Sequence, residues 1–278
     1  MNTENFLQCG RFQLDLNRPK IMGILNLTPD SFSDGGKFIE PRNALIHAEK
    51  MLKDGADILD IGAESTRPGS ESISVEEEIS RLKPVVSELL KQSLPISIDT
   101  KNTRTMEAML DLGVDMINDV RALEDDGAVD LVAKYDCAVC LMHMRGMPIN
   151  MQMDTNYGNL LAEVSGYLQE RARICLEAGI DKKRICLDYG FGFGKTPEQN
   201  FELVRQTRVF VELGYPILLG VSRKSSIGHF LGGAPVQERI TASAVVAAFG
   251  AYFGAKIIRA HDVRETKDAL LMCEQFMK

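Results

Sequence analysis

The sequence alternates between short apolar runs and longer segments in which apolar residues recur at helical spacing. We predict strands at 20–25, 58–63, 95–99, 116–119, 138–143, 184–189, 216–222 and 256–261. Helices are expected after them, at 41–55, 75–92, 102–112, 127–135, 157–178, 198–213, 236–253 and 263–277. Runs without polar alternation are typical of parallel strands covered on both faces. Eight such units predict an α/β fold, the (β/α)8 TIM barrel, with an open doubly wound sheet as the alternative.

The length of the chain fits one such barrel. It has 278 residues, whereas a closed barrel needs about 250. Apolar residues make up 45% and charged residues 26%, and no Pro/Ser-rich linker or low-complexity block interrupts them. We therefore predict a single domain over 1–278.

The net charge restricts the partners. A formal charge of −7 argues against broad binding to nucleic acid or to a membrane surface, because both require a positive field. An anionic substrate would have to be held by a local cluster of cations. The first residues show no basic region followed by an apolar run, so we expect a cytoplasmic protein.

The uncharged segment 240–255 is too short to cross a membrane, which takes about 20 apolar residues. Its many Ala and Gly residues suit a helix pressed between the barrel and a neighbouring molecule. A subunit interface at this segment is our hypothesis.

Two of the six cysteines, Cys137 and Cys140, have the spacing of some metal sites. They lie on a predicted strand, where residues three apart face opposite sides and cannot share one ion. We expect buried free thiols.

Polar side chains stand at the C-terminal ends of the predicted strands: Asn26, Asp60, Asp99, Asn118, His143, Asp188, Ser222, Lys224, Arg259 and His261. In a closed barrel these ends converge on one mouth, where barrel enzymes carry their active sites. The sequence therefore predicts one site built from several strands.

Arg259 and His261 stand two apart on the last strand and therefore face the same way. An Arg fork and a His donor suit phosphate oxygens, so the pair predicts an anion site. The alternative is that Arg259 bridges carboxylates at the barrel end. Asn26 ends the first strand, beside the last one, and is a candidate ligand of Mg²⁺ shared with substrate phosphates. The alternative for Asn26 is a turn or capping role.

Asp99, Asn118 and Asp188 form a second group. A buried carboxylate needs a partner. A flat ligand that presents two parallel N–H donors, such as a pterin, would satisfy Asp188 as a guanidinium does. The alternative is a network of salt bridges with Lys224 or Arg259.

The glycine-rich segment 190–196 does not fit a nucleotide motif, because Tyr189 and Lys195 stand where glycines are required. We expect its glycines to let the backbone approach a flat ligand, with Phe193 as a wall of the pocket. Lys224, just past the seventh strand, is expected to contact the ligand, with a solvated side chain as the alternative. Met142 is expected to line the ligand pocket.

Two polar, glycine-marked segments follow the first two strands. They are Asn26–Gly35 and Glu64–Gly69, and their position over adjacent strand ends suggests a lid.

Eight motifs, NLTPDSFSDGG, GAESTRPG, SIDT, IND, LMHM, GFGFGK, GVSRKS and IIRAHD, together resemble the ordered motif set of the dihydropteroate synthase family. The resemblance implies a TIM barrel, usually dimeric and a target of sulfonamides. It also implies a transferase of folate biosynthesis, which joins 6-hydroxymethyl-7,8-dihydropterin diphosphate to 4-aminobenzoate and releases diphosphate.

The resemblance assigns roles by motif. It implies Asn26 for Mg²⁺, and Thr66, Asp99, Asn118, Met142, Asp188, Phe193, Lys224, Arg259 and His261 for the pterin diphosphate. It implies Phe32, Arg67, Pro68 and Ser222 for 4-aminobenzoate. Of these, Asp99, Lys224, Arg259 and His261 are the expected catalytic residues.

The family commonly has Pro where this chain has Tyr189, and Gly where it has Ala63. Tyr189 makes the aim of Asp188 an open question, because proline would fix the backbone there. Two other functions are weighed: a pterin-binding methyltransferase barrel, which has no use for the two lid segments, and a catalytically silent pterin-binding module.

Overall fold

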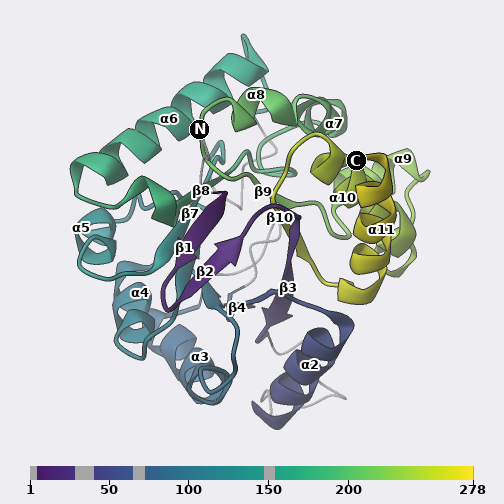
Figure 1. Cartoon of the computed structure of the whole chain (residues 1–278). Coiled ribbons are helices and arrows are strands. Elements are labelled where there is room, and N and C mark those ends of the chain that lie inside the picture. The colour runs from purple at the N-terminus through teal and green to yellow at the C-terminus, as the bar shows by residue number, and fades with distance from the viewer. Residues whose placement is uncertain (1–4, 29–40, 65–72, 147–153, 278) are drawn as a thin grey trace.

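A computed structural model describes residues 5–28, 41–64, 73–146 and 154–277. Its centre is a parallel sheet of eight strands in the order β8-β7-β6-β5-β4-β3-β10-β9. A parallel bridge between Leu187 and Ile217 joins the two ends of this order, so the sheet closes into a barrel (Figure 1). The strands are β3 (Lys20–Asn26), β4 (Ile58–Gly62), β5 (Ile96–Asp99), β6 (Met116–Asp119), β7 (Ala138–Met142), β8 (Ile185–Asp188), β9 (Leu218–Gly220) and β10 (Ile257–Ala260).

Helices surround the barrel as an outer ring (Figure 1). They are α2 (Pro41–Asp54), α3 (Val75–Leu89), α4 (Thr103–Leu110), α5 (Ala128–Val132), α6 (Leu160–Glu177), α7 (Pro197–Arg205), α8 (Thr207–Val211), α9 (Ser225–Phe230), α10 (Ile240–Tyr252) and α11 (Val263–Phe276), with the 3-10 turns η1 (Lys182–Arg184) and η2 (Val236–Arg239). The predicted (β/α)8 barrel is confirmed, and each predicted strand overlaps an observed one.

Two helical predictions need correction. The segment 198–213 forms two helices, because the chain leaves helical geometry at Gln206, where φ is −100° and ψ is 18°. The short helix α9 was not predicted. Its six residues are too few to show a helical period in the sequence.

An antiparallel hairpin, also not predicted, precedes the barrel: β1 (Phe6–Cys9) and β2 (Phe12–Asp15). It crosses one end of the ring of strands (Figure 1). Leu7, Leu14 and Leu16 pack there against Met22, Ile58, Met116, Ala138, Cys140, Cys186, Leu218 and Ile257 inside the barrel. The hairpin therefore closes the N-terminal end of the barrel, and any ligand must enter from the other end.

The cysteine prediction is confirmed. Cys137 and Cys140 are both buried and carry free thiols. Cys140 pairs in register with Cys186 on the next strand. Both thiols thus belong to the apolar packing of the molecule.

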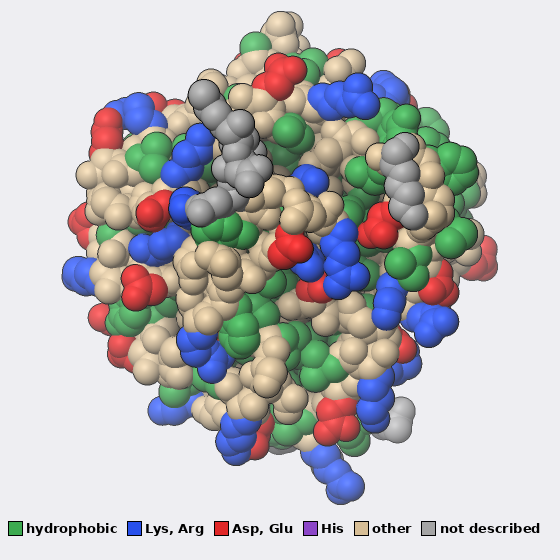
Figure 2. All heavy atoms as spheres, in the orientation of Figure 1, with side chains coloured by type: hydrophobic (Ala, Val, Ile, Leu, Met, Phe, Trp, Pro, Cys, Tyr) green, Lys and Arg blue, Asp and Glu red, His purple; other side chains and the backbone are tan. Residues whose placement is uncertain are grey.

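Helix α10 matches the expected uncharged helix. Its small residues lie against the barrel so closely that a Cβ added at Gly250 would come within 2.1 Å of Leu219 Cδ2. Its outer face exposes Val245, Phe249 and Tyr252. Among the described residues, no helix is long and apolar enough to span a bilayer. On the hairpin face, acidic and basic side chains are interspersed (Figure 2).

Candidate active site

The C-terminal ends of the barrel strands meet in one mouth, as predicted. Asp99 on β5 pairs in register with Asn118 on β6, whereas Asp60 on β4 pairs with Ser97, and Arg259 reaches both carboxylates from β10. Each of these side chains is mostly buried. They lie close together because the parallel strands of a closed barrel bring their C-terminal ends to one edge.

Arg259 bridges two carboxylates. Its Nε donates to Asp60 Oδ2 over 2.6 Å and its Nη2 to Asp99 Oδ2 over 2.5 Å. Asp60 also accepts hydrogen bonds from Ser97 Oγ at 2.7 Å and from Asn118 Nδ2 at 3.1 Å. The bridging role that the sequence left as an alternative is therefore present. Among the described residues, Nη1 has no hydrogen-bond partner and remains able to donate to an anion.

Charge and burial act against each other in this cluster. Burial raises the pKa of Asp99 to about 7, although the Arg259 charge works to lower it, and Asp60 adds to the rise. Burial acts to lower the pKa of Arg259, but Asp60 and Asp99 raise it above its ordinary value. Arg259 is therefore always charged, whereas Asp99 exchanges its proton near neutral pH.

Asp188 and Lys224 form the neighbouring part of the mouth. Asp188 Oδ1 accepts a hydrogen bond of 2.7 Å from Gly190 N. Burial raises the pKa of Asp188, while the charge of Lys224 lowers it. Lys224 Nζ donates to the Phe191 carbonyl and lies 4.3 Å from the centroid of the Phe193 ring. Burial lowers the pKa of Lys224 to about 8.

Two predicted wall residues, Met142 and Phe193, pack together with Val120 in a small apolar cluster. This cluster is separate from the main core, and it lies next to Lys224 through the Phe193 ring. The walls and the cation are thus on one side of the mouth.

Ser222 and His261 join the ends of β9 and β10. Ser222 Oγ lies 3.0 Å from His261 Nδ1 and accepts from His261 N at 3.2 Å. Between Ser222 and Lys224, Arg223 has a left-handed backbone with φ +58°. Its side chain turns away and donates to Asp262 through Nε, over 2.8 Å, and through Nη2. This pair fixes the two strand ends relative to each other.

Tyr189 stands where the family commonly has Pro, and its side chain points away from the mouth. Tyr189 is fully buried, and its hydroxyl lies 3.2 Å from Thr207 Oγ1 on α8. Its ring packs at 5.1 Å from that of Phe210. Asp188, which ends β8, is also buried but faces the mouth, where the charges of Lys224 and Arg259 act on it.

Several predicted positions are not described. Phe32, Thr66, Arg67 and Pro68 lie outside the described residues, as does most of the two segments expected to form a lid. Asn26 is described: it ends β3, is half-buried, and pairs in register with Gly62. Its role as a Mg²⁺ ligand stays a prediction.

Sequence reasoning placed Asp60 at the mouth but gave it no role in the site, and it missed Lys195. Asp60 is fully buried in the strand Ile58–Gly62, where a charged residue among apolar ones was the available signal. Lys195 is 1% exposed, and only the structure shows that its chain turns inward. His143 was placed at the mouth but contacts Tyr167 and Lys195 instead.

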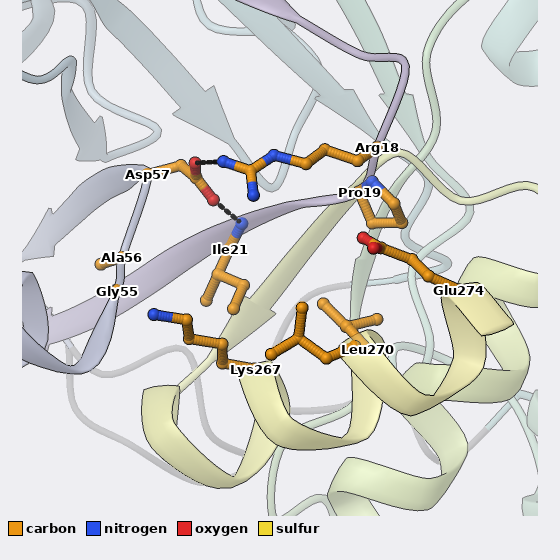
Figure 3. Close-up of a pocket in the computed structure, with 10 residues that line it drawn as sticks. Arg18, Pro19, Ile21, Gly55, Ala56, Asp57, Lys267, Leu270 and Glu274 are labelled. Carbon is orange, nitrogen blue, oxygen red and sulfur yellow. Dashed lines mark hydrogen bonds and ion pairs between the residues drawn. The ribbon is translucent and has the colours of Figure 1, made fainter.

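A cavity of about 250 Å³ lies at the opposite end of the barrel (Figure 3). It is lined by the starts of β3 and β4 and by Lys267 and Leu270 of α11. Asp57 accepts from Ile21 N at 2.9 Å and lies 3.8 Å from Arg18 Nη2. The Asp57 carboxylate is thus already partnered, and barrel enzymes react at the other end.

Comparisons with known proteins identify the family of this chain. The family model described as "Pterin binding enzyme" matches residues 22–261. The dihydropteroate synthase of Neisseria meningitidis serogroup C is 52% identical over 267 residues, which cover 95% of this chain and 94% of the relative.

Two solved structures have the same fold. The Xanthomonas albilineans dihydropteroate synthase with 4-aminobenzoic acid superposes with a TM-score of 0.93 at 42% identity, covering 99% of both chains. The Yersinia pestis enzyme in a sulfonamide drug complex gives a TM-score of 0.93 at 42% identity, covering 98% of this chain and 99% of that one.

A closed barrel with buried acids, an amide and cations at one mouth, together with the family match, assigns the chain to the pterin-binding enzymes. Within that family it belongs to the dihydropteroate synthases of folate biosynthesis.

Proposed function

We propose that the mouth of this barrel binds 6-hydroxymethyl-7,8-dihydropterin diphosphate and 4-aminobenzoate side by side and joins them, with release of diphosphate. The observation that carries the proposal is the gathering of Asp188, Asp99 and Arg259 at one mouth. Arg259 Nη2 donates to Asp99 Oδ2 over 2.5 Å, and the charge of Arg259 also acts to lower the pKa of Asp188, which burial raises. Neither the methyltransferase nor the silent module has an observation in its favour.

The pterin would lie between Asp188 and the apolar walls. Two parallel N–H donors of the ring system match the Asp188 carboxylate, which keeps one backbone donor, Gly190 N, to fix its orientation. Asn118 and Lys224 would contact the remaining polar edge. Met142 and Phe193 would cover the flat faces of the ring.

The diphosphate would lie next to Arg259 and His261. Arg259 donates hydrogen bonds to Asp60 through Nε and to Asp99 through Nη2, and its Nη1 would donate to the phosphate oxygens. His261 stands on the same strand, held through Ser222.

A Mg²⁺ ion fits this arrangement. Among the described residues there is no group of three or more His, Cys, Asp or Glu side chains that would hold a metal by itself. An ion held by Asn26 and the two phosphates of the substrate agrees with the preference of Mg²⁺ for few protein ligands. When bound, it would neutralise charge on the leaving diphosphate.

The reaction would proceed by departure of the diphosphate before attack, an SN1-like path. Arg259 and His261 would stabilise the leaving anion. Two carboxylates with one guanidinium leave the Asp60, Asp99 and Arg259 cluster with a negative charge when Asp99 is ionised, and this charge would stabilise the developing pterin cation. The arylamine is neutral at pH 7 and needs no strong base.

The second substrate would lie near Ser222, with Phe32, Arg67 and Pro68 contributed by the lid segments. The Yersinia pestis relative forms a complex with a sulfonamide drug. We expect sulfonamides to compete with 4-aminobenzoate in this chain as well.

The activity is tested by supplying the dihydropterin diphosphate, 4-aminobenzoate and Mg²⁺, and measuring dihydropteroate and free diphosphate. Their stoichiometric formation is expected. For the SN1-like path, positional exchange of labelled oxygen in the diphosphate substrate is expected. Its absence under conditions where return is detectable would contradict that path.

We further propose a cytoplasmic homodimer. Helix α10 exposes Val245, Phe249 and Tyr252 at the i, i+4, i+7 spacing of one helix face, and the end of α9 exposes Phe230, which is 55% accessible. Both helices lie on the same flank of the barrel (Figure 1). An exposed apolar face of this kind is typical of a protein interface.

A further inference from the structure

Lys195 ends the glycine-rich loop between β8 and α7, and its ammonium group is enclosed by the protein. Its Nζ lies 2.9 Å from both Gly190 O and Phe193 O, and 3.1 Å from His143 Nδ1. His143 O lies 3.4 Å away. Among the described residues, no carboxylate forms an ion pair with this ammonium.

The atoms around Lys195 all accept hydrogen bonds. Burial and the charge of Lys195 lower the pKa of His143 to about 3, so the imidazole is neutral and offers its Nδ1 lone pair. Burial also lowers the pKa of Lys195, to about 7, although the nearby charge of Asp188 works to raise it. A buried cation held only by neutral acceptors is costly, and an apolar side chain would fill the space without that cost. The hydrogen bonds of the ammonium therefore have a use beyond filling space.

The loop 190–196, which Lys195 joins to His143, contains or contacts three of the residues proposed to bind the pterin. Gly190 N holds Asp188 Oδ1, Phe191 O accepts from Lys224 Nζ, and Phe193 forms the wall beneath Lys224. His143, on the other side of the ammonium, follows the wall residue Met142. Lys195 thus connects the ends of two strands under the pterin side of the mouth.

The backbone of the loop 190–196 packs closely against the end of β7, so its conformation is restricted. Gly190 has φ +68°, and a Cβ there would lie 1.9 Å from His143 O. The Gly194 carbonyl accepts from the Tyr157 hydroxyl at 2.9 Å, and the Asn200 side chain accepts from Gly192 N at 2.6 Å. These two hydrogen bonds fix Gly194 and Gly192. Lys195 joins Gly190 and Phe193 of the same loop to His143, which follows β7.

We propose that Lys195 is a positioning residue for pterin binding: its ammonium ties His143, Gly190 and Phe193 together and thereby fixes the wall of the pocket and the carbonyl that orients Lys224. It does not touch the substrate. The inference rests on the proposed placement of the pterin beside Asp188, Phe193 and Lys224.

The test is the Lys195→Met variant, which keeps the length of the side chain and removes the donors. We expect KM for the pterin diphosphate to rise about tenfold or more, as for the loss of charged hydrogen bonds. KM for 4-aminobenzoate and kcat should stay within about threefold, because groups at the reacting carbon are untouched. The control is Lys53→Met, the same change at an exposed position of α2, and it should alter neither constant.

A folded Lys195→Met variant with unchanged KM for the pterin diphosphate would overturn the proposal. An equal rise in both KM values would also overturn it, because that is the result of general loosening.

If Lys195→Met does not fold, a pair of variants at His143 replaces it. His143→Leu removes one acceptor from the ammonium, whereas His143→Asn keeps an acceptor oxygen near the same place. We expect a higher KM for the pterin diphosphate in His143→Leu than in His143→Asn. Equal values in the two variants would contradict the proposal.

The Asp188→Asn variant separates this inference from the proposed function. If Asp188→Asn weakens pterin binding and Lys195→Met does not, only the positioning role fails. If neither variant weakens binding, the placement of the pterin itself is wrong.

Discussion

Arg259 stands between two buried carboxylates, so its removal affects stability as well as binding. In Arg259→Ala, Asp60 and Asp99 lose their shared cation, and we expect the free energy of unfolding to fall by roughly 3–5 kcal/mol at pH 8. At pH 6 the loss should be smaller, since the pKa of Asp99 is already raised to about 7 and rises further without Arg259, so that Asp99 takes up a proton.

Urea unfolding at the two pH values measures this effect. The control is Arg264→Ala, which breaks an ion pair whose Arg side chain is 63% exposed and should cost less than about 1 kcal/mol. The diphosphate substrate should also bind at least about tenfold more weakly to Arg259→Ala, as calorimetry would show. Unchanged substrate affinity would rule out the anion-binding role of Arg259.

Lys224 predicts an alkaline limit to substrate capture. Because burial lowers the pKa of Lys224 to about 8, the ammonium loses its proton as pH rises through that value. The neutral amine then no longer offers a charged hydrogen bond to the polar edge of the pterin. We expect kcat/KM for the pterin diphosphate to fall above about pH 8, since this ratio reports groups of the free enzyme. In Lys224→Met the ratio should be lower at pH 7, and the fall near pH 8 should be missing, which leaves only the fall near pH 7 expected from Lys195. A fall near pH 8 that persists in the variant would show that another group causes it.

At the scale of single residues, positions were predictable, whereas the partners were named only in part, with Arg259 bridging carboxylates as an alternative. The order of polar residues along the chain identified Asp99, Asn118, Asp188 and Arg259. It did not show that Arg259 would pair with Asp60, which is 199 residues away. Such a pairing depends on which strands become neighbours and on the rotamers that packing allows.

At the scale of elements, the N-terminal hairpin shapes the barrel from the end opposite the site. Leu7 is fully buried there, so Leu7→Ala should lower the free energy of unfolding by about 2–5 kcal/mol. Both KM values should be unchanged at temperatures where the variant is folded. The control is Gln13→Ala on the exposed side of the same hairpin, with an expected change within about 0.5 kcal/mol.

The result is read from denaturant unfolding together with steady-state kinetics. A change in KM for either substrate in Leu7→Ala would mean that the two ends of the barrel are coupled, contrary to this expectation.

At the scale of the whole molecule, the exposed face of α10 predicts assembly. Phe249 is 55% accessible, and a glutamate in its place would put a charge into an apolar interface. We expect Phe249→Glu to sediment as a monomer where the unmodified chain sediments as a dimer. Ile46→Glu, also at a position 55% accessible but on α2, should remain a dimer. A monomeric unmodified chain would refute the proposed dimer outright.

The sequence by itself determined the number and order of the barrel units, because apolar runs and helical spacing are local properties. It also determined which polar residues reach the mouth, since a closed parallel barrel brings its strand ends together wherever they stand in the chain. The hairpin escaped this reasoning because its strands are four residues long and gain their stability only by covering the barrel.

Only the tertiary structure decided which side chains at the mouth contact one another. The bridge from Arg259 to Asp60 and Asp99, the inward turn of Lys195 and the outward turn of Tyr189 all depend on contacts between residues far apart in the sequence. Hydrogen bonds and burial act through space, and no local pattern encodes which distant group will be the partner.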